Sequence, residues 1–333
     1  MRILITGGAG FIGSHIAEYF CRVGSAKTGT GSVPADTPGC TCTRFCDVEI
    51  VVLDNFRSGF RHNLDGLNCR LIEGSVTDPA AVQDAVKGVD YIFHLAAMIS
   101  VPESMGKPKD CVEINTQGTL NVLDAAAKAG VKKLCLSSSA AVYGDNPTLP
   151  KTEDMLPEPK SPYAVTKLDG EYYCRMFNDQ GWLKTACMRY FNVFGPRQDP
   201  KSQYAAAVPI FIDKAIGNEP ITIFGDGAQT RDFVYVRDVV AANVFLAMRP
   251  DLCGVYNVAN GRTITIKALA EKIIALTGSK SEIRFAPERA GDIKHSCAAI
   301  DKIQSAGFTP SSAFDDGLAA TIDFFRHKES SGI

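Results

Sequence analysis

The chain has 333 residues, of which 45% are hydrophobic and 22% charged, and its formal net charge is −2. This length is enough to bury a full hydrophobic core, in one large α/β unit or in two closely joined domains. The near-neutral charge gives no attraction for nucleic acid or for an anionic membrane, so we expect neither as a partner. No apolar run approaches the roughly 20 residues of a membrane-spanning helix, and Met1–Gly7 is not typical of a signal peptide. We therefore expect a cytoplasmic protein.

The first two thirds of the chain alternate short apolar segments with helical ones. We predict strands at Arg2–Thr6, Glu49–Asp54, Arg70–Glu73, Tyr91–Ala96, Lys132–Ser137 and Thr185–Tyr190. Amphipathic or alanine-rich helices are expected at Ile12–Val23, Pro79–Val86 and Gly118–Ala129. Such alternation predicts an α/β fold with a doubly wound parallel sheet, the Rossmann fold. Beyond about Asn192 the alternation becomes irregular, which indicates a smaller, interleaved C-terminal lobe.

Residues 24–46 interrupt this alternation. They are rich in Gly, Ser, Thr and Pro, so we predict a surface insertion between the first helix and the second strand. Cys40, Cys42 and Cys46 invite a metal site, but their spacing matches no standard zinc pattern and no nearby histidine completes it. The chain has 11 cysteines, an odd number, and most stand singly in apolar segments. We favour free thiols and an inert loop, and we predict no metal.

A glycine loop lies between the first strand and the first helix. Gly7, Gly10 and Gly13 form a G-x-x-G-x-x-G pattern. Glycine allows the backbone to turn sharply and approach a pyrophosphate, and the N-terminus of the following helix favours phosphate. This context predicts a dinucleotide site.

Asp54 ends the second predicted strand. A carboxylate there can accept hydrogen bonds from the adenosine ribose, and it repels a 2′-phosphate, so NAD is favoured over NADP. Between Ser14 and Asp54 lie 39 residues, more than the expected spacing of roughly 20. Removal of the 23 residues of the insertion leaves 16, close to that value. We therefore assign residues 1–192 to an NAD-binding domain and residues 193–333 mainly to substrate binding.

Three polar side chains indicate the chemistry. Ser139 follows a predicted strand, at the edge of the sheet where ligands bind. Ser161-Pro162 opens a helix on which Tyr163 and Lys167, four residues apart, share one face. A free tyrosine has a pKa near 10, and to lower it by about 3 units requires about 4 kcal/mol. A nearby ammonium and a positive nicotinamide can supply this energy. We predict that Tyr163 acts as the base and that Ser139 positions the substrate hydroxyl.

Together these motifs resemble the extended short-chain dehydrogenase/reductase family over nearly the whole chain. The group that is most similar is the UDP-hexose 4-epimerases, and within it the UDP-N-acetylglucosamine 4-epimerases. Further segments that carry the resemblance are His94–Ala97, Val142–Gly144, Arg189–Asn192, Arg231–Val236 and Arg289–Asp292.

The resemblance implies roles for particular residues. The catalytic residues would be Tyr163, Lys167 and Ser139. NAD would be bound by the glycine loop and by residues near the strand ends: Gly7, Gly10, Phe11, Ile12, Gly13, Asp54, Asn55, Ser58, Gly59, Ser75, Val76, Leu95, Ala96, Ala97, Asn115, Tyr163, Lys167 and Phe191. Ser75 stands where the family has an aspartate. The UDP-sugar would contact Ser139, Tyr163, Asn192, Val208, Phe224, Arg231, Arg289, Asp292 and Ser296.

The absence of acidic residues directly after Ser139 indicates which reaction of the family to expect. Family members that eliminate water or decarboxylate their substrate need acidic residues directly after the serine, and this chain has Ala140 and Ala141 there. Oxidation at C4 followed by reduction from the other face needs no further acid. The resemblance places Ser296 beside the sugar, where members confined to UDP-glucose and UDP-galactose carry tyrosine. We therefore predict a UDP-sugar 4-epimerase that favours N-acetylated sugars and also takes plain ones.

Three alternatives stay open. The enzyme could be restricted to UDP-glucose, or it could act on UDP-glucuronate. The second ranks lower because phosphate would occupy Arg289 and no other clamp for a carboxylate is visible. The third is a non-catalytic NAD-binding sensor, which is disfavoured because Ser139, Tyr163 and Lys167 are all present. The resemblance also implies a homodimer through helices near Gly118–Ala129 and Tyr163–Asp179, although Ala125–Ala129 would suit packing onto the sheet equally well.

Overall fold

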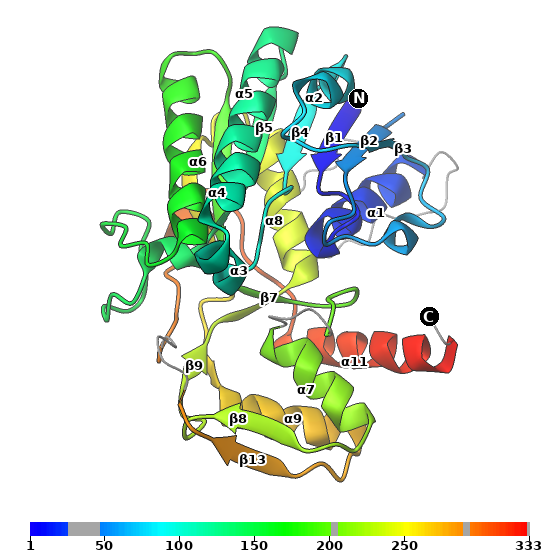
Figure 1. The fold of residues 1–333 in the computed structure, drawn as a ribbon, viewed down its shortest axis with the longest axis vertical. Helices are drawn as coiled ribbons and strands as arrows, with labels where there is room; N and C mark the ends of the chain where they lie inside the picture. Colours follow the sequence, from blue (N-terminus) through cyan, green and yellow to red (C-terminus); the bar gives the residue numbers. More distant parts are fainter. Residues whose placement is uncertain (26–46, 201–205, 289–293, 332–333) are drawn as a thin grey trace.

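The computed structural model describes residues 1–25, 47–200, 206–288 and 294–331. Two lobes are visible in Figure 1: a larger one that contains the main sheet and the helices that cover it, and a smaller one below it. The predicted insertion lies outside the described residues, except that its first residues, Gly24 and Ser25, end the first helix. Among the described residues, no helix is long and apolar enough to cross a membrane.

The larger lobe is built on a seven-stranded sheet in the order β11-β6-β5-β4-β1-β2-β3, with every neighbouring pair parallel. Its strands are β1 (Arg2–Thr6), β2 (Glu49–Asp54), β3 (Arg70–Glu73), β4 (Tyr91–His94), β5 (Lys133–Ser139), β6 (Thr185–Tyr190) and β11 (Gly254–Val258). The first six match the predicted strands closely; β11 was not predicted.

Helices cover both faces of this sheet, because each strand sends alternate apolar side chains to opposite sides. One face packs against α1 (Phe11–Ser25) and α8 (Val236–Met248), and the other against α2 (Pro79–Val86), α5 (Gly118–Ala129) and α6 (Pro162–Asp179). In β1, for example, Ile3 and Ile5 belong to the first core and Leu4 to the second. The predicted doubly wound Rossmann fold is confirmed.

The smaller lobe has its own apolar core. It consists of α7 (Ala207–Ile216), α9 (Ile266–Thr277) and α11 (Phe314–Ser331), together with the parallel pair β8 (Ile221–Phe224) and β13 (Ile283–Ala286). Between its segments the chain returns to the larger lobe to form α8 and β11. The two lobes are therefore interleaved along the sequence.

Short elements complete the described chain. They are β7 (Asn192–Phe194), which pairs with β10 (Phe233–Tyr235), β9 (Thr230–Arg231), which pairs with β12 (Ile264–Thr265), the α-helices α3 (Val101–Gly106), α4 (Pro108–Cys111) and α10 (Asp301–Ser305), the 3₁₀ helices η1 (Arg61–Leu64) and η3 (Ala140–Tyr143), and a π-helix, η2 (Val112–Gln117).

Candidate active site

The strand order reverses between β1 and β4, which opens a crevice at the carboxyl edge of the sheet. Most residues predicted to bind the cofactor follow strand ends at this edge. Gly7 follows β1, Asn55 follows β2, Ser75 follows β3 and Leu95 follows β4. Parallel strands thus bring together segments that are far apart in sequence.

The glycine loop packs too closely for side chains. Gly7 has a φ of +70°, and a Cβ on it would lie 2.7 Å from Ala96 N. A Cβ on Gly13 would overlap the carbonyl oxygen of Gly7. The loop therefore brings bare backbone to the start of α1. No acidic residue lies in the first turn of α1, and the N–H groups of Phe11, Ile12 and Gly13 precede the first intrahelical bond, from Ser14 N to Gly10 O (3.0 Å). This end of the helix suits a pyrophosphate.

Asp54 holds the loop in place. One of its carboxylate oxygens accepts a bond from Ala9 N (2.8 Å) and the other from Phe56 N (2.8 Å). Each oxygen keeps a further lone pair, so the carboxylate can also accept bonds from ribose hydroxyls. The segment after it lies on the loop, with Phe60 N donating to Ala9 O at 3.0 Å. The residues at this edge therefore fit a dinucleotide.

The structure brings Tyr163, Lys167 and Ser139 together. Ser161 caps α6 by accepting a bond from Ala164 N, and the helix presents Lys167 with its Nζ 5.7 Å from the centre of the Tyr163 ring. Lys167 Nζ donates to Ser137 O at 2.7 Å, which fixes it on β5. Ser139 Oγ accepts a bond from Ala141 N (3.1 Å).

The pKa directions differ from the sequence prediction. Burial raises the pKa of Tyr163, and a hydrogen bond with Ser139 opposes this shift. Burial also lowers the pKa of Lys167 to about 8. The surrounding chain alone therefore favours the neutral phenol.

Behind Lys167 lies a directional hydrogen-bond chain through His94. This side chain is fully buried, and burial and then the charge of Lys167 lower its pKa to about 3, so the ring is neutral. Thr119 Oγ1 donates to Asn115 O at 2.5 Å, so it must accept the proton of His94 Nε2 (3.0 Å). His94 Nδ1 then accepts from Thr6 Oγ1 (2.7 Å). The chain connects the ends of β1 and β4 to η2 and fixes Asn115.

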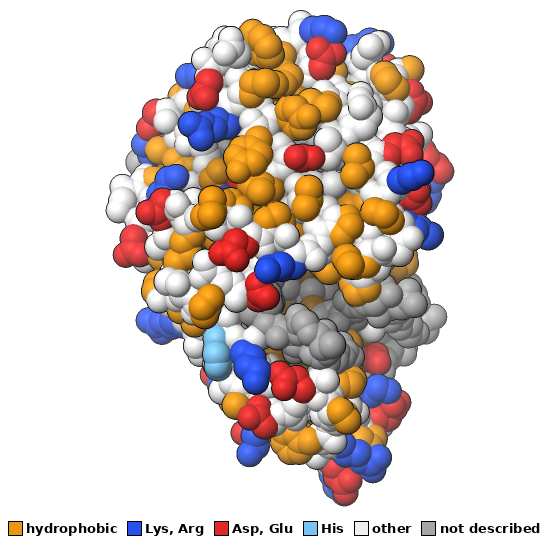
Figure 2. All heavy atoms as spheres, turned by 60° about the vertical axis from the view of Figure 1, so that its left-hand side comes forward, with side chains coloured by type: hydrophobic (Ala, Val, Ile, Leu, Met, Phe, Trp, Pro, Cys, Tyr) orange, Lys and Arg blue, Asp and Glu red, His pale blue; other side chains and the backbone are white. Residues whose placement is uncertain are grey.

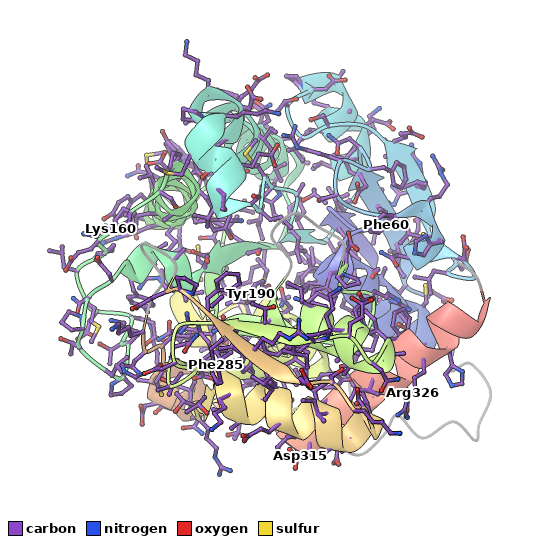
Figure 3. All side chains as sticks on the ribbon, turned by 60° about the horizontal axis from the view of Figure 1, so that its bottom comes forward. Phe60, Lys160, Tyr190, Phe285, Asp315 and Arg326 are labelled. Carbon is purple, nitrogen blue, oxygen red and sulfur yellow. The ribbon has the colours of Figure 1, made fainter. Side chains whose placement is uncertain are left out.

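A cavity of about 360 Å³ opens between the lobes, beside the end of β6. Tyr190, one of its lining residues, lies near the middle of the view in Figure 3. The lining also contains four of the predicted substrate residues: Ser139, Asn192, Arg231 and Ser296. Its other members are Ala140, Ala141, Tyr143, Gly144, Lys151, Phe191 and His295.

Not every predicted residue faces this cavity. The Val208 side chain is fully buried in the core of the smaller lobe, so a substrate contact there would have to come from its backbone. Phe224 lies at the end of β8 and Tyr163 on α6, and neither is in the lining. Arg289 and Asp292 lie outside the described residues. The described residues hold no cluster of His, Cys, Asp and Glu that could bind a metal, and Cys40, Cys42 and Cys46 lie outside them.

Sequence reasoning missed Lys151, Tyr143 and His295. Lys151 reaches the cavity because residue 151 pairs with residue 298, a contact across the chain that no local pattern indicates. Tyr143 was quoted only as part of a motif; its hydroxyl donates to Asn257 Oδ1 at 2.7 Å, and its ring lies under Arg189.

A glycine loop at the switch point of a Rossmann sheet, with a tyrosine–lysine pair beside it, defines a dinucleotide-dependent protein. The family model for the NAD dependent epimerase/dehydratase family matches residues 3–259. The chain belongs to this family, and NAD is its cofactor.

Known proteins resemble the chain along its whole length. A putative UDP-glucose 4-epimerase of Methanocaldococcus jannaschii is 32% identical, with 98% of each chain covered. A UDP-N-acetylglucosamine 4-epimerase of Methanobrevibacter ruminantium, solved with UDP-N-acetylmuramic acid, is 36% identical, with a TM-score of 0.88 and 98% of each chain covered. The UDP-glucose 4-epimerase of Thermus thermophilus, solved with NAD, is 33% identical, with a TM-score of 0.84. The match covers 98% of this chain and 99% of that chain.

Proposed function

We propose that this protein is an NAD-dependent 4-epimerase of UDP-sugars. It interconverts UDP-GlcNAc and UDP-GalNAc, and also UDP-Glc and UDP-Gal, through a transient 4-keto sugar. The observation that carries the proposal is the cavity in which Ser139, Asn192, Arg231 and Ser296 meet. The similar proteins named above include epimerases of both kinds of sugar, which supports the same conclusion.

The mechanism assigns a task to each side chain. NAD, held by the glycine loop and Asp54, would supply the hydride-transfer chemistry at C4. Tyr163 Oη removes the proton of the 4-hydroxyl and later returns it, while Ser139 Oγ hydrogen-bonds the same hydroxyl. Lys167 keeps a positive charge beside Tyr163 because Ser137 O holds its ammonium. These residues need no further acid to complete a redox-neutral cycle.

The cavity wall supports epimerisation over elimination or decarboxylation. No Asp or Glu is among the residues that line the described part of the cavity. Ala140 and Ala141 form the wall directly after Ser139, and they leave space for a keto sugar to turn. The sugar must turn while the nucleotide stays bound. We therefore assign binding of the UDP moiety to Asn192, Arg231, Arg289 and Asp292. Arginine suits a diphosphate through paired, charge-assisted hydrogen bonds.

The choice of sugar depends on Ser296. Its small side chain lines the cavity, where it leaves room for an acetamido group. The change Ser296→Tyr should lower kcat/KM for UDP-GlcNAc at least about tenfold relative to UDP-Glc, which corresponds to about 1.4 kcal/mol. Initial rates on both sugars measure the ratio. An unchanged ratio would show that Ser296 does not select the sugar.

The direct test incubates the purified protein with each UDP-sugar separately and then separates the C4 epimers. We expect interconversion without added cofactor, because NAD is regenerated in each cycle. A dehydrogenase would need added NAD and would accumulate an oxidised product. A non-catalytic sensor would bind NAD and leave every UDP-sugar unchanged, and that outcome would refute the proposal. We also propose a cytoplasmic homodimer.

A further inference from the structure

Lys151 is a buried cation in the wall of the sugar cavity. Its side chain is 4% exposed, and the residue lines the cavity together with Ser139 and Ser296. Lys151 N donates to Cys297 O (2.8 Å) and Ala299 N donates to Lys151 O (2.8 Å), so the backbone is fixed next to Ser296. The ammonium donates to the carbonyl of Asn146, which lies just beyond η3. Lys151 therefore stands between the two segments that carry Ser139 and Ser296.

None of the described carboxylates forms an ion pair with this ammonium. Asp145 and Glu158 are the carboxylates whose charge acts on it, but Asp145 pairs with Lys160 (3.1 Å) and Glu158 accepts a bond from Asn146 Nδ2 (3.2 Å). An ammonium has three N–H donors, and a buried charge without a partner is costly.

A second buried lysine in the chain shows the usual solution. Lys133 Nζ donates to three carbonyls at the end of α8, Leu246 O (2.6 Å), Arg249 O (2.7 Å) and Leu252 O (2.6 Å). All three of its donors are used, and the residue is only 1% exposed. Within the described part of the chain, Lys151 Nζ has one acceptor, Asn146 O, and the residue lines a cavity whose described lining contains no Asp or Glu.

We propose that the cavity accepts UDP-hexoses that carry a carboxylate, such as a uronate at C6. The ammonium of Lys151 pairs with this carboxylate and so makes the site selective for charged sugars. The proposal rests on the function proposed above. Lys151 is a cation other than Arg289 that a sugar carboxylate in this cavity could pair with. An ammonium–carboxylate bond in a partly dry cavity is charge-assisted and hence strong.

The test compares UDP-glucuronate with UDP-glucose, which differ only at C6. Wild-type protein should epimerise both, and Lys151→Met should lower the ratio of their kcat/KM values, uronate over glucose, at least about tenfold. Lys151→Arg keeps the charge and should keep most of the ratio. Lys160→Met is the matched control, because it removes an exposed ammonium and its ion pair with Asp145 from the same loop and leaves Lys151 in place. Lys160 lies at the outer edge of the molecule in Figure 3.

Each outcome decides one question. If Lys151→Met lowers both substrates equally, Lys151 only anchors the loop, and the proposal fails. It also fails if wild-type protein epimerises UDP-glucose but neither epimerises UDP-glucuronate nor is inhibited by it, a result that needs no folded variant. If no UDP-sugar is epimerised, the proposed function itself is wrong.

Discussion

The protonation of Tyr163 depends on groups that lie at different distances from its hydroxyl. Burial raises its pKa, and Ser139 is the described group whose hydrogen bond lowers it. Lys167 stays charged near neutral pH because its pKa is about 8, yet its ammonium is bonded to Ser137 O and sits 5.7 Å from the ring centre. The chain thus holds a neutral phenol whose proton can be removed when further positive charge is bound.

Tyr163→Phe should therefore remove the proton acceptor and leave the rest of the site in place. We expect kcat to fall about 10²- to 10⁴-fold, the usual contribution of general acid–base catalysis, with little change in UDP binding. Initial rates and calorimetric titration with UDP measure the two effects. Tyr172→Phe on the exposed side of the same helix is the matched control. Retention of more than about a tenth of the activity would exclude Tyr163 as the base.

At the scale of elements, local patterns predicted much of the site. Glycine spacing and the sequence Tyr163-x-x-x-Lys167 are short-range signals. The glycine loop also directly follows an apolar strand whose position the hydrophobic pattern indicates. Because parallel strands align their carboxyl ends, six predicted strands were enough to place the glycine loop, Asp54 and Ser139 at one edge.

The features that could not be predicted depend on long-range pairing. β11 joins the sheet beside β6, more than 60 residues later in the chain, and its short apolar segment alone does not indicate a seventh strand. Lys151 looks like an ordinary loop lysine until its pairing with Ala298 places it in the cavity wall. Val208 shows the opposite: resemblance suggested a substrate contact, and the apolar face of α7 buries the side chain.

Asp232 joins elements around the cavity and yields a prediction about pH. It is fully buried and accepts bonds from Asn260 N (2.9 Å), Gly261 N (3.1 Å) and Ala298 N (3.1 Å). Burial nevertheless raises its pKa to about 6. Between its ordinary pKa of 3.8 and about 6 the folded state binds more protons than the unfolded state, so this group's contribution to stability falls as pH rises through that window. The fall is about 3 kcal/mol at most.

Asp232→Asn should abolish this pH dependence and add a constant penalty. The amide turns a donor toward backbone donors, which should cost about 1–3 kcal/mol near pH 4, where Asp232 of the folded wild type is protonated. The difference between the two proteins should shrink toward pH 7, because the wild type loses stability as Asp232 ionises. Urea unfolding of both proteins at several pH values between about 4 and 7 gives the two slopes. Asp226→Asn, on an exposed turn where Oδ1 accepts from Ala228 N (2.9 Å), controls for loss of charge. Parallel slopes for Asp232→Asn and wild type would contradict the assignment.

At the scale of the whole molecule, the lobes are interleaved, and the cavity wall takes residues from segments that are far apart in the sequence. Its wall takes Ser139 and Asn192 from segments at strand ends of the larger lobe, and Arg231 and Ser296 from the later part of the chain. β11 lies in the main sheet, and the residues after it return to the smaller lobe as α9. Residues 193–333 therefore include part of the Rossmann sheet, and a cut at residue 192 would remove a strand and a covering helix, α8.

The outer face of α6 argues for a dimer. Val165, Tyr172 and Met176 are 44%, 56% and 41% exposed, and their spacing of seven and four residues places them on one side of the helix. Figure 2 shows the molecule from the side on which α6 lies in Figure 1, with hydrophobic side chains over much of its upper part. Ala126 of α5 is fully buried against the sheet, so the alanine run serves the core at that position. The apolar stripe of α6 is therefore the feature that suits a second copy.

We expect light scattering to give the mass of two chains for wild-type protein at micromolar concentration. The double change Tyr172→Glu with Met176→Glu should give the mass of one chain, because four carboxylates would meet across a two-fold contact without partners. Phe285→Glu is the control: this residue is 54% exposed on β13 in the other lobe, and its change should leave the dimer intact. A dimer that survives the double change would show that α6 does not form the contact, and a monomeric wild type would refute the dimer itself.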